Sequence, residues 1–126
     1  MQCELYSVAL AVDASGDQTV YTENIKGRVA QVRYIPDGTV PLDTGADITI
    51  TSEVTGVSVA ALVNIGTSAF TKALRQATYG LDGAASLFAV AGLPVQDAVY
   101  LAGERLKIVV AQGGVSKKGT LYIWVG

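Results

Sequence analysis

Few side chains in this sequence are suited to catalysis or metal binding. There is no histidine, which removes the most common general base and the most common metal ligand. The single cysteine, Cys3, builds neither a zinc site nor an internal disulfide, and we interpret it as a small apolar residue. Gly113-Gly114 lies between predicted strands rather than before a helix, so it does not match a phosphate-binding loop. We therefore expect no cofactor and no metal.

Carboxylates are the remaining candidates, and most of them fall in or beside predicted turns. Their spacing matches no calcium-binding loop. Aspartate is common in turns because its side chain accepts hydrogen bonds from nearby backbone N–H groups. We interpret as solvated turn residues Asp13, Asp17, Asp37, Asp43 and Asp47.

One of these aspartates lies in a motif with a catalytic counterpart. Leu42-Asp-Thr-Gly-Ala-Asp47, followed by Ile48-Thr-Ile50, resembles the Asp-Thr-Gly signature of retroviral-type aspartic proteases. In that family two copies of the Asp meet across a dimer and share a proton. The resemblance would make Asp43 the catalytic carboxylate, supported by Thr44 and Gly45. The flap hairpin and the later buttressing segment of that family are missing, so an ordinary turn is the preferred interpretation and we expect no enzyme.

Composition places the chain among folded single-domain proteins. Its 126 residues are 50% hydrophobic and 16% charged, a balance that excludes disorder and predicts one domain over 1–126. The net charge is −2 and the nine basic residues are scattered, which argues against nucleic acid as a partner. Glu4 interrupts the first apolar run, so we expect no signal peptide and synthesis in the cytoplasm. Val54–Thr71 is uncharged but too polar to span a membrane.

Short apolar runs separated by turn residues predict an all-β chain. Alternating side chains in 6–12, 19–23, 27–35, 47–51 and 57–65 are typical of strands. Turn residues follow at Asp13–Asp17, Pro36–Gly38 and Thr55–Gly56. This order predicts an antiparallel β-sandwich or jelly roll of about seven to nine short strands.

The end of the chain has the strongest strand pattern. Two β-prone runs, Glu104–Gln112 and Thr120–Val125, flank the glycine-rich segment Gly113–Gly119, and this pattern predicts a closing β-hairpin. Lys117 and Lys118 would lie exposed at its tip. Side chains alternate along a strand, so the predicted core positions are Leu106, Ile108, Val110, Leu121, Ile123 and Val125.

The middle of the chain permits two interpretations. Helical spacing is present at Phe70, Ala73, Leu74 and Ala77, with Thr67 or Ser68 as a possible cap. The neighbouring segments are all strand-like, so we prefer extended chain, with an edge strand over Thr71–Arg75. We expect Gly80–Gly92 to be a long loop or bent strand that packs over one end of the sandwich.

The order of these segments resembles one family across nearly the whole chain. Small tailed-bacteriophage proteins encoded beside the major capsid protein, similar to capsid decoration (cement) proteins, show a comparable succession. The matching pieces are Asp13–Asp17, Thr19–Thr22, Gly27–Val29, Val32–Tyr34, Asp47–Thr51, Gly56, Glu104–Gly114 and Gly119–Thr120. Phe70–Leu101 matches least.

The resemblance implies a structural role on the virion. Such a protein binds the outer surface of a lattice of HK97-type major capsid protein and bridges neighbouring capsomers, which stabilises the head. Many weak contacts on a symmetric lattice act together. The implied partners are the major capsid protein and further copies of the chain, as a homodimer or homotrimer, with neither nucleic acid nor membrane. An alternative is a β-sandwich module on the phage surface that recognises carbohydrate or the host surface.

Contact residues are predicted from apolar character outside clear strands. The preferred contact segment is Tyr79–Gly92, and its candidates are Tyr79, Leu81, Leu87, Phe88 and Val90. Lys117 and Lys118 are added as an exposed loop tip. Aromatic side chains are suited to either core or interface, and we take core as the default for Tyr21, Tyr34, Tyr79, Tyr100 and Trp124.

Overall fold

The computed structural model describes residues 4–65, 67–77, 79, 81–89, 92–97 and 99–126. Within these ranges the chain forms antiparallel strands and no helix, as predicted. The strands are β1 (Glu4–Ala11), β2 (Gln18–Pro36), β3 (Asp47–Ser52), β4 (Ser58–Leu62), β5 (Phe70–Lys72), β6 (Gln76–Ala77), β7 (Gln96–Asp97), β8 (Val99–Ala111) and β9 (Lys118–Val125). The described residues contain no helix long and apolar enough to cross a membrane.

The 19-residue strand β2 organises the sheet. Its first half, Gln18–Val29, pairs with β8, and its second half, Val29–Pro36, pairs with β9. Register shifts interrupt both ladders near the middle of β2, where the strand bends. Gly27 lies in this bend with a φ of +117°, a conformation that only glycine adopts without strain. The two strands predicted at 19–23 and 27–35 are therefore halves of one bent strand.

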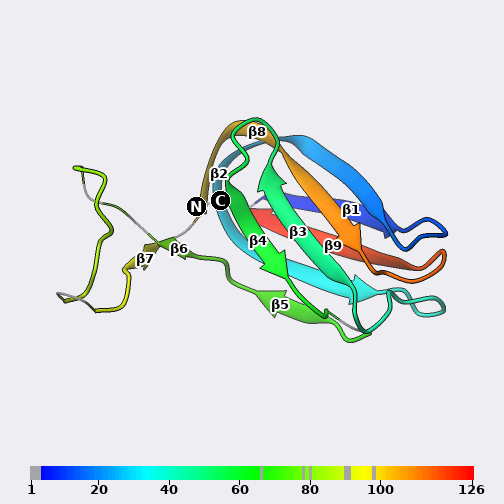
Figure 1. Ribbon diagram of the computed structural model, residues 1–126. Helices are drawn as coiled ribbons and strands as arrows, with labels where there is room; N and C mark the ends of the chain where they lie inside the picture. Colours follow the sequence, from blue (N-terminus) through cyan, green and yellow to red (C-terminus); the bar gives the residue numbers. More distant parts are fainter. Residues whose placement is uncertain (1–3, 66, 78, 80, 90–91, 98) are drawn as a thin grey trace.

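Because β2 bends, one continuous sheet folds into two layers (Figure 1). One layer contains β1, β9, the second half of β2 and β5; the other contains the first half of β2, β8, β3 and β4. Apolar side chains from both layers fill the space between them, as in a β-sandwich. All six core positions predicted in the closing strands are buried, together with Leu10, Val32, Tyr34, Ile48 and Ile50.

The predicted closing hairpin is wrong, although both of its strands form. β2 lies between β8 and β9, so the two strands belong to different layers and do not pair with each other. The loop between them crosses from one layer to the other and is held by backbone hydrogen bonds to other loops: Gly113 N–H donates to Gly16 O at 2.9 Å, and Asp43 N–H donates to Gly113 O at 3.0 Å. A glycine-rich loop between two apolar strands is equally compatible with a hairpin and with such a crossing.

Between β5 and β8, the described residues 73–77, 79, 81–89 and 92–97 form an arm that extends away from the sandwich (Figure 1). It leaves the sandwich after β5 and returns at β8, and the short pair β6 and β7 closes its base. The expectation that Gly80–Gly92 packs over one end of the sandwich is therefore wrong for the described part of that segment. Leu81, Leu87 and Phe88 are exposed instead. β5 and β6 confirm the extended interpretation over the helical one, but the edge strand predicted over Thr71–Arg75 ends at Lys72.

Candidate functional site

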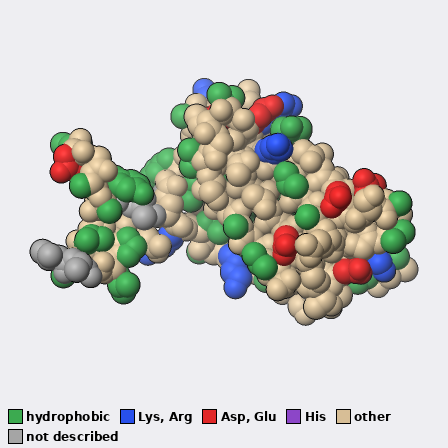
Figure 2. All heavy atoms as spheres, viewed as in Figure 1, with side chains coloured by type: hydrophobic (Ala, Val, Ile, Leu, Met, Phe, Trp, Pro, Cys, Tyr) green, Lys and Arg blue, Asp and Glu red, His purple; other side chains and the backbone are tan. Residues whose placement is uncertain are grey.

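The arm carries the described members of the predicted contact segment. Leu81 is fully exposed, Phe88 is 76% exposed and Tyr79 is 65% exposed; Leu87 is the least exposed of the four. Val90, the fifth predicted contact residue, lies outside the described residues. Figure 2 shows hydrophobic side chains over much of the arm's surface. Contact of these side chains with water is unfavourable by roughly 25 cal/mol per Å² of apolar area, so the arm is suited to a partner surface.

Backbone hydrogen bonds hold the tip of the arm in shape. Phe88 N–H donates to Leu93 O at 3.1 Å, and Val95 N–H donates to Ser86 O at 2.8 Å. These bonds place Phe88 beside Leu93, which is 77% exposed. The two backbone bonds therefore hold Phe88 and Leu93 side by side, which lowers the entropy cost of binding.

Lys117 and Lys118 lie at the opposite end of the sandwich from the arm (Figure 1). Lys118 begins β9 and its N–H donates to Val40 O at 2.8 Å; its side chain is exposed, while Lys117 is half-buried. The structure thus separates the predicted contact residues into two groups, one at each end, instead of bringing them together.

A second apolar surface lies on the outer face of the β1–β9–β2 layer. It is lined by Leu5, Arg33, Ile35, Tyr122 and Trp124. The rings of Tyr122 and Trp124 are 6.1 Å apart, centroid to centroid.

Of the five aromatic residues that we assigned to the core by default, Tyr34 is the one that is buried there. Trp124 is half-buried on this outer face, and the side chains exposed to solvent are Tyr21, Tyr79 and Tyr100.

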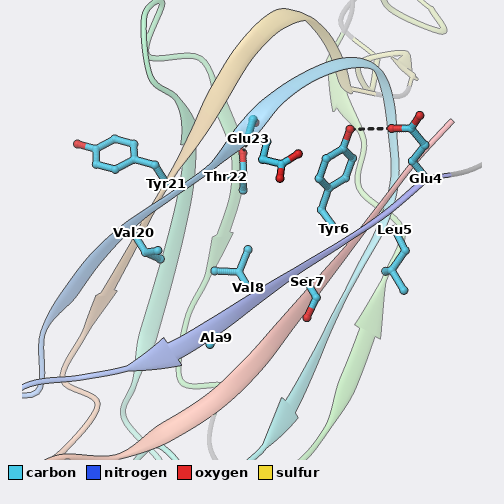
Figure 3. A pocket seen from close by; sticks show the side chains of 10 residues that line it. All are labelled: Glu4, Leu5, Tyr6, Ser7, Val8, Ala9, Val20, Tyr21, Thr22 and Glu23. Carbon is cyan, nitrogen blue, oxygen red and sulfur yellow. Dashed lines mark hydrogen bonds between the residues drawn. The ribbon is translucent and has the colours of Figure 1, made fainter.

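A groove of about 740 Å³ lies between β1 and the first half of β2 (Figure 3). Each strand faces the groove with an edge that pairs with no other strand in the described chain. The partner of β1, which is β9, and the partner of this half of β2, which is β8, lie on the opposite edges. The groove separates the two layers at this side of the sandwich. Its walls are residues 4–9 of β1 and 20–23 of β2.

One end of this groove is apolar and the other is acidic. Val8 is buried and Val20 half-buried toward the end where the β1–β2 turn closes the groove. At the open end the Tyr6 hydroxyl donates a hydrogen bond to Glu4 at 2.7 Å, and the side chains of Tyr6 and Glu23 point toward one another (Figure 3). This bond to Glu4 raises the pKa of Tyr6, and burial and the negative charges of Glu4 and Glu23 raise it further. Among the described residues, neither carboxylate forms an ion pair.

Sequence reasoning missed this groove. The alternation of apolar residues predicts both strands, but no sequence signal tells which strands lie at the edges of a sheet. Tyr21, on the same stretch of β2, points away from β1 (Figure 3). Its ring lies under the Arg105 guanidinium, 4.5 Å from ring centroid to Cζ, and Arg105 also forms a salt bridge with Glu53.

The Asp-Thr-Gly segment lies in the loop before β3, at the end of the sandwich opposite the arm. The turn is closed by Ala46 N–H, which donates to Asp43 O at 3.0 Å. The Asp43 carboxyl group packs over Gly114, where an added Cβ would lie 2.6 Å from Asp43 Cγ. Asp13 and Asp37 accept backbone N–H bonds within their own turns, in agreement with the turn interpretation. No cluster of three metal-ligating side chains occurs among the described residues.

Comparisons with known proteins add little to this geometry. No protein-family model and no curated protein matches the chain. The crystal structure of FlhE is similar over 99% of this chain and 98% of its own, with 11% sequence identity and a TM-score of 0.40. A likeness of that size carries no argument about function.

Proposed function

We propose that this chain is a bacteriophage virion structural protein that binds the outer surface of an HK97-type major capsid protein lattice and stabilises the head. The sequence resemblance motivates the proposal, and one structural observation carries it. The arm presents Leu81, Phe88 and Leu93 to solvent at a distance from the sandwich. A side chain such as Phe88 is stabilised by a partner that buries it, and the shell is that partner in this proposal. The role requires no catalysis.

Bridging of neighbouring capsomers requires more than one contact surface on the protein. The arm supplies one, and the outer face with Tyr122 and Trp124 supplies a second on a different side of the sandwich. Aromatic residues are over-represented at the centres of protein interfaces. Repetition of both contacts over a symmetric lattice multiplies weak affinities. A homodimer or homotrimer at a local symmetry axis belongs to the same proposal.

The direct test mixes the purified protein with expanded capsids that lack any decoration protein. We expect ordered density on the outer surface in an icosahedral reconstruction by electron cryo-microscopy, with the arm in contact with the shell. Intact shells without added density at saturating protein would refute the proposal.

Phe88→Asp is the sharpest variant for this test. A carboxylate buried in an apolar contact is strongly unfavourable, so we expect shell binding to fall by at least about 100-fold, which corresponds to about 2.7 kcal/mol. Folding should be unaffected because Phe88 is exposed. Val54→Asp is the matched control, since Val54 is 79% exposed on a loop of the sandwich and not on the arm. If Phe88→Asp binds the shell as well as the natural chain does, the arm is not part of the interface.

A further inference from the structure

The groove between β1 and β2 has the features of an acceptor site for an added strand. An edge strand presents unpaired backbone N–H and C=O groups that pair with an extended peptide. β1 pairs with β9 through Glu4–Ala11 without a register shift, so its free edge is regular along the groove. The facing part of β2 contains a register shift between Tyr21 and Asn24, which makes it a poor template for pairing. β1 is therefore the edge that accepts a strand, and β2 forms the opposite wall.

The length and shape of the groove suit a short extended segment. Residues 4–9 of β1 line it, and six residues of strand span about 20 Å. The groove is closed at one end, where Ala11 N–H donates to Gln18 Oε1 at 2.8 Å across the β1–β2 turn. A peptide therefore enters at the end with Glu4 and Glu23. Its inward side chains meet Val8 and Val20, which favours small or β-branched apolar residues there.

Charge selects the class of peptide. Glu4 and Glu23 stand at the entrance, and neither has a cationic partner among the described residues. We propose that this groove binds an extended basic segment of another polypeptide, which adds to β1 as a strand and places a Lys or Arg side chain at the entrance, beside Glu4 and Glu23. This inference does not depend on the capsid proposal, because the arm and the groove are separate surfaces.

A library of displayed random decapeptides, selected against the full-length protein at low salt, tests the inference. We expect enriched peptides to alternate apolar and polar residues and to contain Lys or Arg near one end. A synthetic copy of an enriched peptide is then titrated into isotopically labelled protein. The expected amide shifts are confined to residues 4–9 and 20–23. Successive N–H groups of a strand point to opposite edges, and one edge of the peptide pairs with β1. N-methylation of every second amide should therefore abolish binding when the methylated amides face β1, and should leave binding unchanged when they face away from it.

Two double variants distinguish charge recognition in the groove from attraction of a basic peptide by the net charge of the protein. Glu4→Gln with Glu23→Gln should weaken binding of the basic peptide about 5- to 10-fold. The amide oxygen of Gln still accepts the Tyr6 hydroxyl, so the local fold is preserved. Asp82→Asn with Glu104→Gln makes the same change in net charge away from the groove and should leave binding within about 2-fold.

Four outcomes would overturn the inference, and the last of them is self-association. The first is a library without enrichment, and the second is a footprint on the arm or the outer face. The third is equal binding by both double variants. Concentration-dependent self-association with shifts in the groove would assign the site to a second copy of the chain, which also contradicts a basic partner segment.

Discussion

At the scale of single residues, close packing around Tyr34 shows how little space the core leaves. Tyr34 is fully buried, and its ring lies 5.6 Å from that of Phe70 and over Gly119. Its hydroxyl has no hydrogen bond of normal geometry among the described residues. Burial raises the pKa of Tyr34, and the interaction with the Leu42 backbone lowers it by less. Gly119 is therefore required for the space that its missing side chain leaves to the Tyr34 ring.

Gly119→Ala should destabilise the fold. The added Cβ would lie 2.7 Å from Tyr34 Cε1, and a buried ring held on its other side by Phe70 has little room to move. We expect a loss of about 1–3 kcal/mol in the free energy of unfolding, measured by urea denaturation. Gly38→Ala is the control, because nothing lies within 4 Å of its Cβ position. Equal stabilities for the two variants would contradict this account.

Asp37 should contribute to the acid sensitivity of the protein. Its carboxylate accepts N–H bonds from Val40 at 2.9 Å and Thr39 at 3.0 Å, and these bonds lower the pKa of Asp37 from its ordinary value of 3.8. A carboxyl group whose pKa is lower in the folded state than in the unfolded state stabilises the fold at pH values above its unfolded-state pKa. This contribution is lost as the pH falls through the folded-state pKa. Asp37→Asn should therefore lose less stability than the natural chain below about pH 4. Parallel curves of urea midpoint against pH would contradict the prediction.

At the scale of elements, a side chain of the bent strand β2 accepts a backbone hydrogen bond at a point where the pairing of β2 with β8 is interrupted. Where its register with β8 shifts, Leu106 N–H donates to Thr22 Oγ1 at 3.0 Å, and this hydroxyl donates to Glu23 O at 2.8 Å. Both ends of the interaction are buried or nearly so. The hydroxyl therefore satisfies a backbone group that would otherwise be buried without a partner.

Thr22→Val tests this role because it keeps the shape and removes the acceptor. The Leu106 N–H would lose its partner, and we expect a cost of about 1–3 kcal/mol in the free energy of unfolding. Thr22→Ser retains the hydroxyl and should cost about 0.8 kcal/mol for the lost methyl group. Hydrogen exchange at the Leu106 amide should be faster in the valine variant only. Similar exchange in both variants would show that another group satisfies this amide.

At the scale of the whole molecule, the sandwich contains the buried core and the arm contains exposed apolar side chains. The seven-stranded sheet and the core lie in the sandwich, whereas the described arm residues are mostly exposed. The arm is closed at its base by the pairing of Ala77 with Gln96. Stability and partner binding are therefore expected to be separable.

Replacement of residues 78–95 by an Asn-Gly turn tests this separation. Ala77 and Gln96 are already paired, so a two-residue turn can join them. The shortened loop costs less closure entropy, so we expect the free energy of unfolding to be unchanged or higher by up to about 2 kcal/mol. Shell binding should be lost. A large drop in melting temperature by calorimetry would show that the arm is part of the sandwich's folding unit.

The sequence by itself determined the strand character and the core positions of this protein. Alternation over two residues predicts which side chains face inward, so Ile48, Ile50 and the six positions of the closing strands could be assigned before any fold was known. The turn roles of Asp13 and Asp37 could be assigned likewise, because their hydrogen bonds are local, whereas Asp47 begins β3 and accepts a bond from the distant Asn64 N–H. The exposed apolar segment around Phe88 was also identifiable as a stretch without a clear strand pattern.

Only the tertiary structure decided which strands are neighbours. Pairing depends on contacts between residues distant in sequence, so the bend at Gly27 that places β2 between β8 and β9 has no local pattern that reveals it. The same reason applies to the groove, since Glu4 and Glu23 line one groove only because β1 and the first half of β2 have free edges in opposite layers. The exposure of the arm was also visible only in the fold, since Phe88 lies outside the buried core cluster and is 76% exposed.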